Sequence, residues 1–288
     1  MARRLFCEIS PLTYRISMQK EILLRHAKDL FSRETLARDR DPAMETHFPN
    51  VVKAHASILR RRLHGVDMRL QENKITNLRL AAEKLNTLVI APGETFSFWH
   101  IVGPTDERHG FKTGLVIAKN GFVEDWGGGL CQMANLIHWL VLNSPLTVTE
   151  LHHHSDALFP DERRRVPFGT GTSVCYNNID YRFRNDTDQP VGLLIWLTDE
   201  ELCGELRSER PYPCRYRLTE ENHHFRREGE KYFRISQVYR TVTDRESGEV
   251  LRRELILDNH SAVMYDPALI PPDEIREDDE GQDGHEDA

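Results

Sequence analysis

One stretch of the chain limits the possible folds: the ten residues 133–142, MANLIHWLVL, are nearly all apolar. Met133, Leu136, Ile137 and Leu140 recur at intervals of three and four residues, which is typical of one face of a helix. Trp139 and its neighbours add apolar surface on other sides, and a helix that is apolar nearly all round is usually buried. The run is far shorter than the roughly 20 residues needed to span a bilayer. The sequence therefore predicts a domain with enough further layers to enclose this helix.

The elements expected around this helix change type along the chain. Helical spacing is found in 18–38, 51–63 and 71–88. Extended or alternating segments follow at 94–99, 110–123, 146–151, 179–185 and 191–197, and a hairpin is expected between 231–242 and 249–257. This order indicates an α+β fold with a helical N-terminal part, a central helix packed on a mostly antiparallel sheet, and a β-rich C-terminal part. We divide the chain into a helical region 1–70, a central module 71–200, a β-rich region 201–272 and an acidic tail 273–288.

Negative charge is concentrated at one end of the chain. The formal net charge is −8, and residues 273–288 hold nine acidic side chains and one arginine. The remaining residues therefore carry equal numbers of acidic and basic side chains, which gives no electrostatic argument for binding nucleic acid. Because the tail has almost no apolar side chains, we expect it to be disordered.

Cysteine usage and the N-terminal segment indicate a compartment. The five cysteines are odd in number, widely spaced and contain no Cys-x-x-Cys, which is typical of a reducing environment rather than of a disulfide framework. The N-terminal residues include two arginines but lack the apolar run of a secretory signal. We therefore expect a cytoplasmic protein without a transmembrane segment, and nothing in the sequence calls for a cofactor.

Cys131 occupies a position in which a thiol can be reactive. It follows Gly127, Gly128 and Gly129 and begins the predicted buried helix. Free backbone N–H groups and the helix dipole at such a position lower the pKa of a thiol. Glycines allow a tight turn and close approach by a substrate. A purely structural cysteine behind a tight turn is the alternative.

A cysteine nucleophile needs a base and a group that orients the base. Three histidines, His152, His153 and His154, follow the strand predicted at 146–151, and Asp180 begins the next strand. A cysteine on a helix followed by histidine and carboxylate on strands is an order used by papain-like and related enzymes, which favours Cys131 as a nucleophile.

Two other readings of these residues stay open. Alternate residues of a strand point the same way, so His152 and His154 could share a zinc ion. No second ligand cluster stands at metal spacing, so we assign no metal site. The basic run Arg163, Arg164 and Arg165 is interpreted as a solvated loop.

Several motifs in this order resemble the VanW family: NLRLAAEKLNTLVIAPGETFSFW (77–99), GGGLCQM (127–133), NSPLTVTELHHH (143–154) and IDYRFRNDT (179–187). The resemblance spans about residues 71–197 and matches the histidine of the family to His154. A Gly-x-Asp-Ala motif that often follows in the family is replaced here by PFGTGTSV (167–174), which lacks the aspartate. The resemblance implies an accessory role in glycopeptide (vancomycin) resistance or cell-envelope metabolism, without specifying the chemistry.

Two hypotheses for the function follow. In the first, Cys131 attacks a peptide-like envelope substrate in acyl transfer or amide hydrolysis, His154 acts as general base and then acid, and Asp180 orients it. Gln132 or a backbone N–H at the helix start stabilises the oxyanion. Glu94 and Trp99 could line the same cleft, although a capping carboxylate and a core aromatic explain them equally simply. In the second, the glycine turn and helix N-terminus hold an anionic envelope precursor without catalysis.

Overall fold

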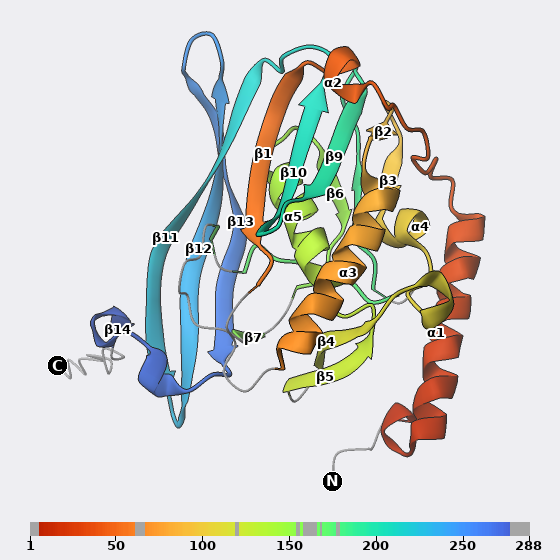
Figure 1. Ribbon diagram of the computed structural model, residues 1–288. Helices are drawn as coiled ribbons and strands as arrows, with labels where there is room; N and C mark the ends of the chain where they lie inside the picture. Colours follow the sequence, from red (N-terminus) through yellow and green to blue (C-terminus); the bar gives the residue numbers. More distant parts are fainter. Residues whose placement is uncertain are drawn as a thin grey trace, which may run out of the picture. The chain divides into compact units, whose positions relative to one another are not determined.

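The structure is a computed structural model that describes residues 6–60, 67–118, 121–153, 156–157, 166–167, 169–176 and 179–276 (Figure 1). The chain divides into two compact units. Unit 1 comprises residues 1–153 and 171–215, and unit 2 comprises residues 154–170 and 216–288. Each unit has its own sheet framework, and each is described separately below.

Unit 1 contains all the described α-helices and most of the strands. In chain order these are η1 (Phe6–Glu8), α1 (Pro11–Phe31), α2 (Met44–His47), β1 (Asn50–Ile58), α3 (Met68–Leu85), β2 (Leu88–Ile90), β3 (Thr95–Ser97), α4 (Phe98–Val102), η2 (Glu107–His109), β4 (Thr113–Ala118), β5 (Gly121–Trp126), α5 (Leu130–Leu142), β6 (Thr147–Glu150), β8 (Arg182–Arg184), β9 (Val191–Leu197) and β10 (Glu201–Ser208). An antiparallel sheet of order β1-β10-β9-β2 forms one layer. The strands β3, β8 and β6 form a second antiparallel sheet, and β4 pairs with β5 as a hairpin.

The helix α5 lies in the core of unit 1, where it packs against β1, β10 and α3 (Figure 1). Ten of its thirteen residues are buried, because apolar side chains project from almost every side of the helix. The predicted helix at 71–88 is α3, whose Leu78, Ala81, Ala82 and Leu85 face the same core. Within the residues described, no helix combines the length and apolar character needed to cross a membrane.

Unit 2 is built mainly from three long strands. β11 (Cys214–Glu228), β12 (Lys231–Asp244) and β13 (Val250–Val263) lie side by side, with β14 (Ile275–Arg276) parallel to β11 and β7 (Asp156–Ala157) parallel to β13. The predicted hairpin is confirmed as β12 and β13, which pair from Phe233 opposite Ala262 to Thr243 opposite Val250. Two short turns, η3 (Pro267–Leu269) and η4 (Pro272–Glu274), precede β14.

The α+β class, with helices toward the N-terminus and strands toward the C-terminus, is confirmed by this arrangement. One predicted element is wrong: residues 51–63 were expected to be helical, but β1 is a strand over Asn50–Ile58. β1 pairs along its length with β10, which the sequence did not indicate, and this ladder outweighs local helical spacing. The predicted strand at 94–99 is also only partly correct, since β3 gives way to α4 at Phe98. Residues 273–276 of the acidic tail form the end of η4 and β14, and 277–288 lie outside the described residues.

Candidate functional site

The turn before α5 is held by its own backbone and by α3. Gly127 and Gly129 have φ values of 72° and 96°, in the left-handed region that favours glycine. A side chain on Gly128 would collide with the backbone of Gly114 in β4. The fully buried amide of Asn77 on α3 donates to Gly128 O at 3.0 Å, and its oxygen accepts from Lys112 N at 2.8 Å. The three glycines therefore serve close internal packing at this turn.

Most amides of this turn are engaged with backbone carbonyls. The N–H groups of Gly127, Gly128, Leu130 and Gln132 donate to Lys112 O, Asp125 O, Gly127 O and Gly129 O respectively. The side chain of Gln132 donates to Ser57 Oγ and Ile58 O, both at 2.9 Å, and so ties α5 to β1. Few donors of the turn are left for an anion, which weakens the structural basis for an anion cradle of the kind expected from the sequence.

Cys131 sits in the first turn of α5 and is half-buried. Its thiol donates to Val174 O at a sulfur–oxygen distance of 3.7 Å. Burial raises the pKa of the Cys131 thiol above its ordinary value. At neutral pH the residue is therefore a protonated thiol, whereas its position in the sequence predicted a lowered pKa.

A polar stripe on α5 continues from Cys131. Cys131, Asn135 and His138 are spaced by four and three residues, which places them on one side of the helix. Asn135 Oδ1 accepts from Thr172 N at 2.6 Å, and His138 Nδ1 lies 3.1 Å from the hydroxyl of Tyr181. Burial, followed by the charge of His153, lowers the pKa of His138 to about 3, so this imidazole stays neutral.

Of the three predicted histidines, the structure describes His152 and His153, which follow β6. Ser173 N donates to His152 O at 2.6 Å, so the backbone after β6 joins residues 172–174, which also contact Asn135 and Cys131. The His152 ring lies 3.0 Å from Glu150. His154, the predicted base, and Arg163, Arg164 and Arg165 are outside the described residues. In the part of the chain that the structure describes, no group of three or more His, Cys, Asp or Glu side chains is placed to hold a metal ion.

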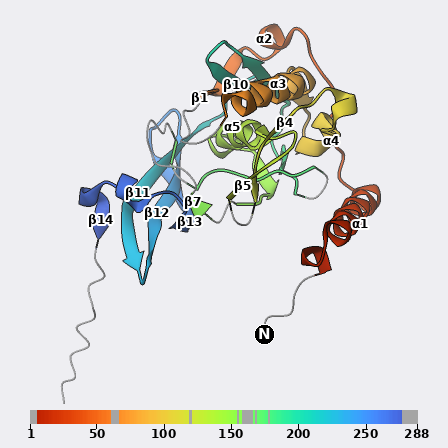
Figure 2. The same ribbon diagram turned by 60° about the horizontal axis from the view of Figure 1, so that its bottom comes forward.

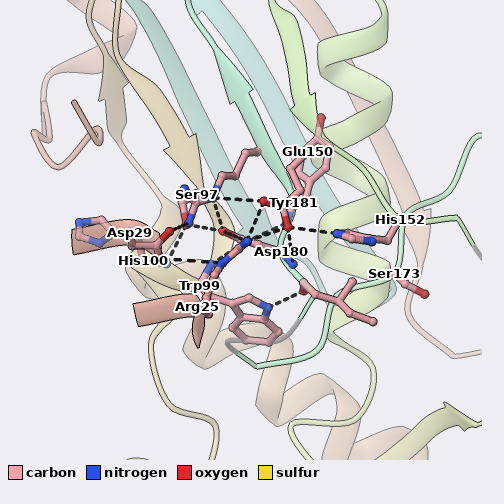
Figure 3. A network of polar contacts seen from close by, with 12 residues as sticks. Arg25, Asp29, Ser97, Trp99, His100, Glu150, His152, Ser173, Asp180 and Tyr181 are labelled. Atoms are coloured by element: carbon pink, nitrogen blue, oxygen red, sulfur yellow. Dashed lines mark hydrogen bonds and ion pairs between the residues drawn. The ribbon is translucent and has the colours of Figure 1, made fainter. Parts of the chain in front are cut away.

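Asp180 lies at the centre of a buried polar network, which reaches His152 through Glu150 (Figure 3). Its Oδ1 accepts from Trp99 N at 3.1 Å and Tyr181 N at 2.9 Å. Its Oδ2 accepts from Ser97 Oγ at 2.6 Å and Arg182 Nε at 2.8 Å, and Arg25 Nη2 lies 3.3 Å away. A carboxylate offers about four lone-pair positions, so these five donors saturate Asp180. None of these donors is an imidazole.

Two arginines connect this carboxylate to α1 and β6. Arg182 pairs with Asp29 at 2.7 Å and Glu34 at 3.0 Å, while Arg25 on α1 reaches Glu150 at 2.7 Å. Burial opposes the charge of Arg182, but Asp180 and Asp29 outweigh it and raise the pKa of this guanidinium. Burial likewise acts to raise the pKa of Glu150, yet the hydrogen bonds from Arg25 and His152 lower it overall. With Asp180, the network holds four carboxylates and two guanidinium groups.

Glu94 and Trp99 occupy structural positions. Glu94 Oε2 accepts from Ala91 N at 2.9 Å and closes the turn between β2 and β3. Trp99 is buried in the core of unit 1 and donates through Nε1 to Ile179 O at 2.9 Å. Both side chains are engaged within the protein.

Sequence reasoning did not anticipate the arginine network. Arg25 and Asp29 belong to a helix that starts the chain, far in sequence from Glu150 and Arg182. The one local signal was IDYRFRN, where Asp180 and Arg182 alternate on a predicted strand and so share a face. Asn135 and His138 were visible as polar interruptions of an apolar helix, and interruptions of this kind mark residues with specific partners.

Comparison with known proteins agrees with the family resemblance indicated by the sequence motifs. The family model described as "VanW like protein" matches residues 73–207. The chain is 34% identical over 201 residues to "Vancomycin B-type resistance protein VanW" of Enterococcus faecalis (strain ATCC 700802 / V583), covering 70% of this chain and 73% of that protein. It is 30% identical over 115 residues to "Uncharacterized protein YoaR" of Bacillus subtilis (strain 168), covering 40% of this chain and 36% of that protein. No solved structure matches the chain. The extent of the first match, together with the family match over the central motifs, shows that the chain belongs to the VanW family.

Proposed function

We propose that this protein is a cytoplasmic accessory component of glycopeptide resistance or cell-envelope metabolism and acts on a peptide-like envelope substrate through Cys131. The named resistance protein among its relatives supports the biological setting. The observation that carries the chemistry is the position of the thiol. It is half-buried at the start of α5, against the 172–174 segment that also bonds the backbone of His152.

The raised pKa of Cys131 defines the kind of mechanism. A preformed thiolate is unfavourable in this environment, so the proton must leave as the sulfur attacks. In the proposed step, Cys131 Sγ bonds to the acyl carbon and His154 takes the thiol proton, then delivers it to the leaving amine. The resulting thioester is resolved by water or by an acceptor amine. This is general-base catalysis, which does not require a lowered thiol pKa.

The surrounding groups take supporting roles in this proposal. Asp180 is saturated by five donors, so we assign it the positioning of the 179–182 segment rather than the orientation of an imidazole. The side-chain amide of Gln132 is bonded to β1, which leaves the Cys131 backbone N–H as the better oxyanion donor.

Reaction with an activated ester tests whether Cys131 acts as a nucleophile. We expect p-nitrophenyl acetate to give a burst of nitrophenolate and an acetyl adduct on Cys131, identified by peptide mass spectrometry. Cys131→Ser and His154→Gln should each reduce the burst by about a hundredfold or more. Cys214→Ser, which changes a cysteine at the start of β11, is the matched control and should behave as the wild type. Equal bursts in Cys131→Ser and the control would exclude the proposed nucleophile.

The non-catalytic binding module is a second candidate, and the raised pKa of the thiol and the occupied Asp180 favour it. In this case a muropeptide mixture released from cell wall should bind with the same affinity to the wild type and to Cys131→Ala, as measured by calorimetry. Binding that survives Cys131→Ala, together with no acyl adduct, would assign the protein to this class.

A further inference from the structure

The first helix, α1, turns its polar side toward the protein. Arg25 and Asp29 lie on the inner side, where they bond Glu150 and Arg182 in the buried network. Surface helices of globular proteins normally bury their apolar side and expose the polar one. In α1 the most exposed apolar side chains face outward, and the ion pairs of Arg25 and Asp29, beside the half-buried Met18 and Ile22, lie against the rest of unit 1.

The outer side of α1 carries large apolar side chains. We call them the apolar stripe; the most exposed members are Leu30 at 79% and Phe31 at 84%. The stripe comprises Leu12, Ile16, Leu23, Leu24, Leu30 and Phe31. It runs for roughly 29 Å at 1.5 Å per residue of helix. In both ribbon views, α1 lies at an edge of unit 1 with no other described element over its outer side (Figures 1 and 2). An exposed set of large apolar side chains of this kind marks an interaction site.

The charges beside the stripe are mainly positive. Arg15, Lys20 and Lys28 are exposed on α1. Of the two acids of the helix, Asp29 faces inward onto Arg182, and Glu21 lies 3.6 Å from Lys20. Among the described residues, neither Arg15 nor Lys28 has a carboxylate partner. Cations that flank an apolar helical surface complement anionic lipid headgroups.

We propose that α1 docks this protein on an anionic phospholipid surface, with the apolar stripe inserted among the acyl chains and Lys20 and Lys28 at the headgroups. A second copy of the chain fits less well. A two-fold contact between two such stripes would bring the same cations against each other and would leave them uncompensated. The proposal does not depend on Cys131, so it stands or falls separately from the proposed chemistry.

Vesicle flotation with the full chain tests this proposal. We expect the protein to float with phosphatidylcholine vesicles that contain phosphatidylglycerol and to remain behind with phosphatidylcholine alone. Leu23→Glu/Leu30→Glu should weaken binding by at least about tenfold. Lys20→Gln/Lys28→Gln should weaken it by about 25-fold, close to fivefold for each cation near the surface. Added salt should reduce binding of the wild type.

The control variant is Leu251→Glu/Leu269→Glu, which places the same two substitutions at leucines of unit 2 that are 55% and 57% exposed. It should bind vesicles as the wild type does. Tryptophan fluorescence verifies that the α1 variants remain folded. Failure to bind anionic vesicles, equal binding to neutral ones, or equal loss in the control would each overturn the proposal. A concentration-dependent dimer abolished by Leu23→Glu/Leu30→Glu, without vesicle binding, would instead assign the stripe to a second copy.

Discussion

Replacing Asp180 by asparagine isolates the contribution of the buried network to the stability of unit 1. The substitution preserves shape but removes one negative charge and places an amide N–H₂ near the guanidinium groups of Arg182 and Arg25. Asp180 is 1% exposed, and Arg182 Nε lies 2.8 Å from its Oδ2. Breaking a buried ion pair on one side costs about 3–5 kcal/mol. Because Asp29 and Glu150 still neutralise the arginines, we expect a loss at the lower limit, about 3 kcal/mol.

The chain contains a matched control for this experiment. Asp186 pairs with Arg184 across the same two-residue spacing as Asp180 with Arg182, at 2.5 Å, but the two side chains are 39% and 49% exposed. Exposed ion pairs contribute about 0–1 kcal/mol. Asp186→Asn should therefore cost less than about 1 kcal/mol, although it makes the same chemical change next to an arginine two residues away.

Tryptophan fluorescence during urea unfolding is the suitable assay. All four tryptophans of the chain belong to unit 1, so the signal reports this unit even if unit 2 unfolds separately. Trp99 also donates its backbone N–H to Asp180. In thermal unfolding, a loss of about 3 kcal/mol should lower Tm by about 6–12 °C for a unit of this size. If Asp180→Asn and Asp186→Asn agree within about 0.5 kcal/mol, the argument that burial makes this network stabilising is refuted.

Three further predictions concern α5 and the glycine turn before it. His138 has a folded-state pKa of about 3, below the ordinary value of about 6.5. Its contribution to the free energy of unfolding is therefore complete above about pH 6.5 and is lost as the pH falls toward 3. Wild type should therefore lose about 1.4 kcal/mol per pH unit more than His138→Gln between pH 6 and 4 in urea titrations, and parallel curves would contradict the assignment. Gly128→Ala should cost about 3 kcal/mol or more, because the new methyl meets the backbone of Gly114, whereas Gly93→Ala, in open space at φ +82°, should cost about 1 kcal/mol by the same measurement. Iodoacetamide labelling of Cys131 should rise only above the ordinary thiol pKa, and half-maximal labelling below about pH 8 would show a thiolate that the structure does not explain.

The core of unit 1 was the part of the fold most accessible from the sequence. An apolar run between Gly129 and Asn143 predicts a buried helix whatever lies around it, and α5 spans Leu130–Leu142. The hairpin of unit 2 was equally visible, because alternating residues flank a polar turn. β1 was mispredicted because its strand character depends on pairing with β10, a partner about 150 residues away whose own sequence gave no strong alternation.

In the candidate site, too, some features were predictable from the local sequence and others depend on distant residues. The place of Cys131 at the start of α5 followed from local glycine and helix signals. Its raised pKa did not, because the burial that causes it depends on residues distant in the sequence, such as Val174. The partners of Asp180 were equally hidden, since Arg25 comes from a helix 155 residues earlier and no local pattern links the two. Local sequence motifs predict which reactive side chains the site contains. Contacts between residues distant in the sequence determine the charge state of each side chain.

Cys131 and the network around Asp180 are joined through the short segment from Val174 to Ile179. The stability of the network and the reactivity of the thiol can therefore be tested for coupling. Cys131 donates to Val174 O, and Cys175 and Ile179 exchange two backbone hydrogen bonds of 2.9 and 3.0 Å. Ile179 leads directly into Asp180. Loosening Asp180 should therefore loosen the carbonyl that covers the thiol.

We expect Asp180→Asn to lower the pH of half-maximal Cys131 alkylation toward the ordinary thiol value, because hydration of the sulfur relieves the burial that raises its pKa. Asp186→Asn should leave the labelling curve unchanged, and peptide mass spectrometry separates Cys131 from the other cysteines. If Asp180→Asn destabilises unit 1 but leaves the curve of Cys131 in place, the network only anchors α1 and β8. If the curve shifts, the ion pairs of α1 also govern access to the thiol, and any partner that pulls on α1 would change the reactivity of Cys131.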